Sequence, residues 1–170
     1  MSSQKAKRAA QNILRETNYT IPVDIRRIIK HYGIEIIEQP MEDNVSGMMV
    51  VKDKRAMIGV NQAHHPNRQR FSLAHELGHY VLHRETQSVF VDSSTIFFRD
   101  ERAADGTDRF EIEANTFAAE LLMPEPDLRT AVRKPLDAFD ERAVSKLAVY
   151  FEVSVQALTI RLTRLKLISA

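Results

Sequence analysis

The chain has 170 residues, of which 44% are hydrophobic, and a formal net charge of +1. Its length fits one domain, or one domain with a small addition, and its apolar content is sufficient for a hydrophobic core. The balanced charge excludes a polyelectrolyte, and the lack of cysteine excludes disulfides, thiolate metal sites and a cysteine nucleophile.

Neither a secretory signal nor a membrane span is predicted. The first 18 residues are charged throughout and contain no apolar core. No apolar stretch approaches the roughly 20 residues that cross a bilayer. Together with the absence of cysteine, this pattern indicates a cytoplasmic protein without a membrane partner.

Two helices are predicted near the start of the chain. Residues 4–16 have amphipathic spacing. Pro22 is expected to open the second helix and Gly33 to end it. The apolar residues of this helix recur at i, i+3, i+4 and i+7, as Ile25, Ile28, Ile29 and Tyr32.

Strands are predicted next, and they define the fold class. They cover residues 34–38, 45–51 and 55–60, with further β character at residues 88–91 and 95–98. The second and third strands flank a short polar turn, which predicts a hairpin. We therefore expect an α+β fold in which a small antiparallel sheet packs on helices. The polar residues 99–109 are predicted to form a flexible loop, either a gate at the cleft or only a connector.

The most informative motif, His75-Glu76-Leu77-Gly78-His79, lies in a helix predicted from near Pro66 to about His83. Four residues make about one turn, so His75 and His79 project from one face and can bind one metal ion. Glu76 is close enough to take a proton from an attacking water. The alternative, two satisfied histidines and a surface glutamate, is disfavoured because burying so many titratable groups without a role is costly. The motif predicts a zinc-dependent hydrolase, and among hydrolases it favours a peptidase.

A catalytic zinc takes three protein ligands, so a third ligand must come from elsewhere. The extended pattern with a third histidine on the same segment fails, because Leu82 and Glu85 occupy its glycine and histidine positions. His83 lies about 12 Å along the helix axis from His75, too far to share one ion. We expect His83 either to line the site or to cap the helix, and Tyr80, which lies near the motif, to line the site.

A second helix, predicted over residues 108–122, offers a carboxylate. Its buried stripe contains Ala114, Phe117, Ala118, Leu121 and Leu122. Glu111 falls on the inward side with Asn115 one turn later, which suits a third ligand and a residue that orients a ligating histidine. Glu113 falls on another flank and is expected to be solvated. Spacing alone leaves open whether Glu111 is a ligand or an exposed helix residue. The small stripe residues predict a close approach of the two helices.

The remainder of the chain, about residues 125–168, is predicted to be helical after Pro124. Residues 144–162 resemble a helix-turn-helix, and residues 142–170 carry five basic side chains against Glu152 alone. We expect residues 1–139 to form the catalytic domain and residues 140–170 a helical hairpin packed on it.

Two segments carry a family resemblance. R-F-S-L-A-H-E-L-G-H-Y-V-L-H at residues 70–83 and E-x-x-A-N-x-F-A-A-x-L-L-M-P at residues 111–124 resemble the ImmA/IrrE-type metallopeptidases, over about residues 20–130. The resemblance implies a gluzincin-like domain with one Zn²⁺ per chain, or another divalent ion such as Mn²⁺. It implies His75, His79 and Glu111 as ligands and Glu76 as the catalytic base.

The resemblance also implies a partner. Members of this family cleave a protein, typically a helix-turn-helix repressor or an antitoxin encoded nearby, in mobile-element induction or stress responses. We expect a site-specific metallopeptidase in which residues 55–60 could pair with an extended substrate. The alternatives are a DNA-binding regulator that uses the C-terminal helices and a catalytically silent metal-binding scaffold.

Overall fold

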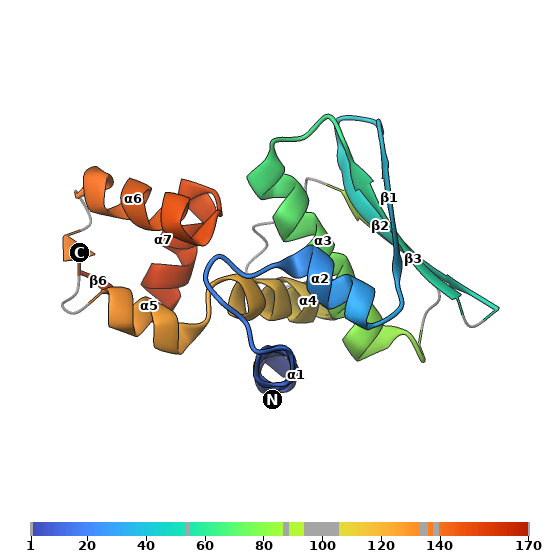
Figure 1. Cartoon of the computed structure of the whole chain (residues 1–170), viewed down its shortest axis with the longest axis horizontal. Helices are drawn as coiled ribbons and strands as arrows, with labels where there is room; N and C mark the ends of the chain where they lie inside the picture. Colours follow the sequence, from blue (N-terminus) through green and yellow to red (C-terminus); the bar gives the residue numbers. More distant parts are fainter. Residues whose placement is uncertain are drawn as a thin grey trace.

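The computed structural model describes residues 2–53, 55–86, 89–93, 106–132, 136–137 and 140–169. The sheet lies at one end of the molecule and helices α5 to α7 at the other, with α3 and α4 between them (Figure 1). The elements are α1 (Ser2–Thr17), α2 (Ile25–His31), β1 (Glu35–Gln39), β2 (Val45–Lys52), β3 (Arg55–Asn61), α3 (Pro66–His83), β4 (Val89–Ser93), α4 (Gly106–Leu122), α5 (Glu125–Ala131), β5 (Leu136–Asp137), α6 (Glu141–Phe151), α7 (Val155–Arg164) and β6 (Ile168–Ser169).

The sheet is mixed, with the strand order β1-β3-β2-β4. The predicted hairpin is confirmed, because β2 and β3 pair antiparallel and Lys52 faces Arg55. β4 also runs antiparallel to β2, but β1 runs parallel to β3. The predicted antiparallel arrangement holds for β2 with β3 and for β2 with β4 but was wrong for β1. Because β2 is already paired on both sides, β1 adds at the free edge of β3, and because it runs opposite to β2 it is parallel to β3. The predicted substrate pairing of residues 55–60 was also wrong, since β3 is a central strand.

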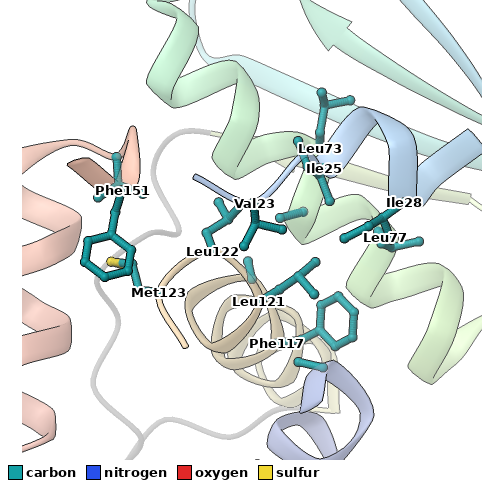
Figure 2. Close-up of a cluster of buried hydrophobic side chains, with 14 of the residues drawn as sticks. Val23, Ile25, Ile28, Leu73, Leu77, Phe117, Leu121, Leu122, Met123 and Phe151 are labelled. Carbon is teal, nitrogen blue, oxygen red and sulfur yellow. The ribbon is translucent and has the colours of Figure 1, made fainter. Parts of the chain in front are cut away.

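The helical core surrounds α4. α4 packs against α3 on one side and α1 on another (Figure 1). Apolar side chains from the segment around α2, from α3 and from α4 meet in one cluster, and Phe151 of α6 packs beside Met123 at its end (Figure 2). The cluster therefore joins the C-terminal helices to the helices that carry the motif.

The close approach predicted for the two motif helices is confirmed at Gly78. A Cβ at this position would lie 3.0 Å from Phe117 Cδ1, 3.2 Å from Ala114 Cα and 3.3 Å from the Ala114 carbonyl oxygen. Contacts this short are repulsive, and two of them involve backbone atoms that cannot move independently. A glycine here lets α3 and α4 touch backbone to backbone.

We therefore expect Gly78→Ala to lower the free energy of unfolding by about 1–3 kcal/mol through overpacking. Helix propensity alone predicts the opposite sign, because alanine in a helix interior is about 1 kcal/mol more favourable than glycine. Denaturant unfolding of the metal-free proteins distinguishes the two effects. A variant more stable than the wild type by about 1 kcal/mol, the full helix-propensity gain, would show that α3 and α4 can separate without cost.

Three local predictions need adjustment. α2 begins at Ile25 rather than at Pro22, because the Asp24 side chain accepts a hydrogen bond from Arg27 N at 3.0 Å and caps the helix there. Residues 106–109 belong to the first turn of α4 and not to a loop. The strand predicted at residues 95–98 and residues 99–105 of the proposed gate lie outside the described residues, so the gate stays a prediction.

The described residues of the C-terminal part form helices, as predicted, and two short strands. β5 and β6 pair in parallel, with Leu136 opposite Ile168. α6 and α7 meet at a bend of 104°, as the helix-turn-helix resemblance predicts. Their junction is tied to α3, because Asn67 Nδ2 donates to the Val153 carbonyl at 3.0 Å. The domain boundary near residue 139 stays a prediction.

No single helix among the described residues has the length and apolar character of a membrane span. α6 and α7 meet these criteria only when they are counted together across their bend.

Candidate active site

The histidine motif lies on the buried side of α3. Pro66 occupies the first turn of this helix, and the His65 side chain caps it by accepting a hydrogen bond from Asn67 N, so the predicted boundaries are confirmed. His75 and His79 are each 1% exposed, and Glu76 is fully buried. Three polar side chains in the interior require polar partners, and one such partner comes from α4.

Glu111 of α4 faces both histidines. Its Oε2 lies 3.1 Å from His75 Nε2, its Oε1 lies 3.2 Å from His79 Nε2, and the two Nε2 atoms are 3.0 Å apart. Among the described residues, this is the one group of three histidine or acidic side chains close enough to hold a metal ion. Tetrahedral ligands of zinc lie about 3.3 Å from one another. The spacing of the three side chains therefore fits a zinc-sized ion.

Asn115 orients one of the two imidazoles. Its Oδ1 lies 3.0 Å from His75 Nδ1, so the amide oxygen accepts the Nδ1 proton. In that tautomer His75 Nε2 turns a lone pair toward the Glu111 carboxylate. Two acceptor atoms 3.1 Å apart repel each other unless a cation or a shared proton lies between them. The donor set therefore suits a cation.

The protonation states also suit a metal ion. When a shared proton rather than a cation lies between the imidazoles and Glu111, burial raises the pKa of this carboxyl, but hydrogen bonds and charge interactions with His75 and His79 outweigh burial and lower the pKa to about 2. Burial lowers the pKa of His79 to about 4, against the opposing effect of Glu111. At neutral pH the carboxylate is therefore charged and this imidazole neutral, which are the forms that bind metals.

Glu76 lies against strand β2. A Cβ on Gly47 would come within 3.4 Å of Glu76 Oε1 and 3.1 Å of the Gly59 carbonyl oxygen. The pairing of β2 with β4 is irregular between Val45 and Gly47, which marks a bulge beside the site. Gly47 could not be assigned to the site from the sequence, since a glycine within a strand indicates a close approach but not the partner that approaches.

The prediction that Glu113 is solvated was wrong. It is 3% exposed, accepts a hydrogen bond from Arg109 Nε at 3.0 Å, and lies 3.6 Å from His83 Nε2. α4 is buried on most of its circumference, because α1 and α3 pack on different sides of it. An inward position is therefore shared by Glu111 and Glu113, but only Glu111 faces the histidine pair.

His83 and Tyr80 lie on different sides of α3. The buried His83 ring has its centroid 5.6 Å from that of His79 and 4.4 Å from that of Phe110, so it borders the metal group. The Tyr80 ring instead contacts Tyr32 and lies beneath the Arg84 guanidinium, on the side of α2. Roles for either residue in lining the site remain predictions. Phe90, which the sequence analysis missed, stacks on His79.

An α+β fold with a buried His-His-Glu group on two packed helices defines a metallopeptidase-like protein. Residues 29–163 match the family model Peptidase_M78, described as the IrrE N-terminal-like domain, and the chain belongs to this ImmA/IrrE family.

Similar proteins include an uncharacterized immunity region protein 2 of Bacillus phage phi105, 28% identical over 70% of this chain and 68% of that protein. The radiation response metalloprotease IrrE of Deinococcus radiodurans is 33% identical over 63% of this chain and 30% of that protein. A solved Mycobacterium tuberculosis transcriptional regulator shares the fold, with a TM-score of 0.63, 19% identity and coverage of 94% of this chain and 46% of that one. The chain thus spans less than half the length of the last two.

Proposed function

We propose that this protein is a zinc-dependent endopeptidase that hydrolyses a peptide bond in a protein partner, a helix-turn-helix repressor or an antitoxin. The observation that carries the proposal is the buried group of His75, His79 and Glu111 with Glu76 beside it. The name of the IrrE relative supports peptidase chemistry. The immunity region name of the phage relative supports a repressor as the partner.

Each residue has a distinct task in this proposal. His75, His79 and Glu111 hold one Zn²⁺, and Asn115 keeps His75 in the tautomer that leaves Nε2 free. The ion, when bound, supplies Lewis acidity toward the scissile carbonyl and the attacking water. Glu76 takes the proton of that water and delivers it to the leaving amine. Burial of Glu76 keeps bulk water from competing for this proton.

Strand β4 is the better candidate for pairing with an extended substrate. β4 is an edge strand of the four-stranded sheet, and the structure describes no strand on its outer side. Its Phe90 ring lies against His79, so the strand runs directly beside the metal group. A substrate segment that added to this edge would pass the site in an extended conformation, which peptidases need to reach a backbone carbonyl.

The proposal is tested by incubating the zinc-loaded protein with the repressor encoded beside it, with and without a chelator, and measuring intact masses. We expect two fragments of the repressor whose masses sum to the parent plus one water, and none with the chelator. A repressor that stays intact under metal-loaded conditions, while a complex of the two proteins forms, would instead favour a catalytically silent scaffold.

Measurements of metal affinity distinguish the roles of the two buried glutamates of α4, Glu111 and Glu113. Glu111→Ala should weaken Zn²⁺ binding by at least the 10–100-fold that loss of an outer-shell partner causes, because a ligand itself is lost. Glu113→Ala removes a carboxylate that is also buried but faces His83 and Arg109 instead, so its effect should be small. The dissociation constants are measured by competition with a chromogenic chelator. Equal losses in the two variants would contradict the assignment of Glu111.

Replacing both histidines provides the reference for complete loss of zinc binding. The double variant His75→Ala, His79→Ala should retain no zinc after dialysis, since one carboxylate cannot hold the ion. Elemental analysis that finds one zinc per chain in this variant would place the ion elsewhere.

A further inference from the structure

The two imidazoles of the metal group are oriented in different ways. His75 Nδ1 has Asn115 Oδ1 as its hydrogen-bond partner at 3.0 Å. His79 Nδ1 is equally buried and has no hydrogen-bond partner among the residues that the structure describes. Metal-ligating histidines almost always use their second nitrogen for a hydrogen bond that fixes the ring. His79 departs from this rule, so another contact must hold its ring.

Phe90 of β4 makes that contact. The rings of Phe90 and His79 are stacked, with centroids 4.1 Å apart and planes inclined by 18°. Phe90 is itself fixed, because it is 5% exposed and its backbone pairs opposite the fully buried Met49 of β2. The Phe110 ring lies edge-on to the Phe90 ring, with the two centroids 6.4 Å apart. Burial and the pairing of β4 with β2 therefore restrict the position of the ring that stacks on His79.

We infer that Phe90 is the positioning residue of the second histidine ligand, holding by stacking the ring orientation that a hydrogen bond holds for His75. The inference rests on the proposed function, because it takes His79 as a metal ligand. A stacked imidazole cannot rotate about its Cβ–Cγ bond without losing face-to-face contact. Rotation is therefore opposed, and His79 Nε2 stays 3.0 Å from His75 Nε2 and 3.2 Å from Glu111 Oε1.

The test compares the same substitution at two neighbouring rings. Phe90→Leu removes the ring that stacks on His79 and leaves an apolar side chain. Phe110→Leu is the matched control, since the Phe110 ring packs on His83, with centroids 4.4 Å apart. The Zn²⁺ dissociation constant is measured by chelator competition. The visible spectrum of the Co²⁺-loaded protein reports the geometry of the ligands.

Phe90→Leu should weaken Zn²⁺ binding by about 3- to 10-fold, the equivalent of one aromatic stacking contact. It should also change the Co²⁺ spectrum. Phe110→Leu should leave the spectrum unchanged and the affinity within about twofold, since a ring that does not touch a ligand contributes less than one such contact. Wild-type affinity in Phe90→Leu would overturn the inference, and so would equal losses in the two variants. A wild-type protein that binds no zinc would overturn the proposed function, and the inference with it.

A measurement on the wild type covers the case in which Phe90→Leu does not fold. The carbon-bound imidazole protons of His79 lie over the face of the Phe90 ring, so its ring current should shift them upfield relative to those of His75. The nuclear magnetic resonance spectrum of the zinc-loaded protein should show this difference. Similar shifts for the two imidazoles would overturn the inference.

Discussion

Glu76→Gln is expected to abolish cleavage of the protein partner while the fold and the metal content stay intact. Glutamine has nearly the same shape as glutamate, so it fits the fully buried position against Gly47 of β2. It cannot take a proton from the attacking water, and loss of such a base slows a reaction by about 10²- to 10⁴-fold. Single-turnover cleavage followed by intact-mass spectrometry measures the rate, and elemental analysis measures the zinc.

The matched control is Glu85→Gln, the same substitution at an exposed residue just beyond α3. This variant should cleave at the wild-type rate. If Glu76→Gln cleaved as fast as the control, another group would have to activate the water. If the variant lost its zinc together with its activity, Glu76 would be required to build the site and its role as a base would be unsupported.

The geometry of α3 was predictable because its signals are local. Pro66 suits the first turn of a helix, and the four-residue spacing of His75 and His79 fixes their common face. The side shared by Glu111 and Asn115 follows from the same periodicity. The structure adds the distances, which depend on how α3 and α4 cross at Gly78.

Glu113 shows where helical periodicity stops being informative. An amphipathic stripe separates inside from outside only when one face of a helix meets solvent. α4 is covered by both α1 and α3, so nearly every position from Glu111 onward is at least half-buried. The sequence could not reveal this enclosure, since nothing in the α4 segment shows that α1 returns to cover its other side.

The strand order and Phe90 required non-local information. The isoleucine-rich run at residues 34–38 predicts a strand but not its partner. β1 pairs with β3 and not with β2, the strand that follows it in the sequence. Phe90 has no chemical signature in a sequence, because phenylalanine is common in strands. Its contact with His79 exists only because β4 pairs with β2 and faces α3.

The position of Arg161 argues against the DNA-binding alternative. It counts among the five basic residues that made the C-terminal helices resemble a DNA-binding element, yet it is 4% exposed. Its guanidinium pairs with the fully buried Glu120 of α4, and its Nε donates to the Met123 carbonyl at 3.2 Å. Glu120 also accepts a hydrogen bond from Gln11 of α1 at 3.0 Å. This arginine therefore fastens α7 to the helical core and is not available to a phosphate.

Arg161→Ala is accordingly expected to destabilise the whole chain, lowering the free energy of unfolding by about 3–5 kcal/mol. The substitution leaves the Glu120 carboxylate buried without its charged partner, which is the costly case for an interior ion pair. Arg164→Ala removes an exposed arginine from the same helix and should change the stability by less than about 0.5 kcal/mol. Denaturant unfolding measures both values, and equal effects would show that the pair with Glu120 contributes nothing.

The same two variants separate docking from DNA binding. Loss of a DNA mobility shift in Arg161→Ala alone would reflect a loosened α7, because this side chain cannot reach solvent without leaving Glu120. Loss of the shift in Arg164→Ala at unchanged stability would require a phosphate contact and would support the regulator hypothesis. Replacing the ion pair as a unit, with Glu120→Leu and Arg161→Met, should restore much of the stability lost in Arg161→Ala, since apolar residues of similar volume often substitute for a buried pair. A double variant no more stable than Arg161→Ala would mean that the hydrogen bond from Arg161 to the Met123 carbonyl, rather than the paired charges, holds α7 in place.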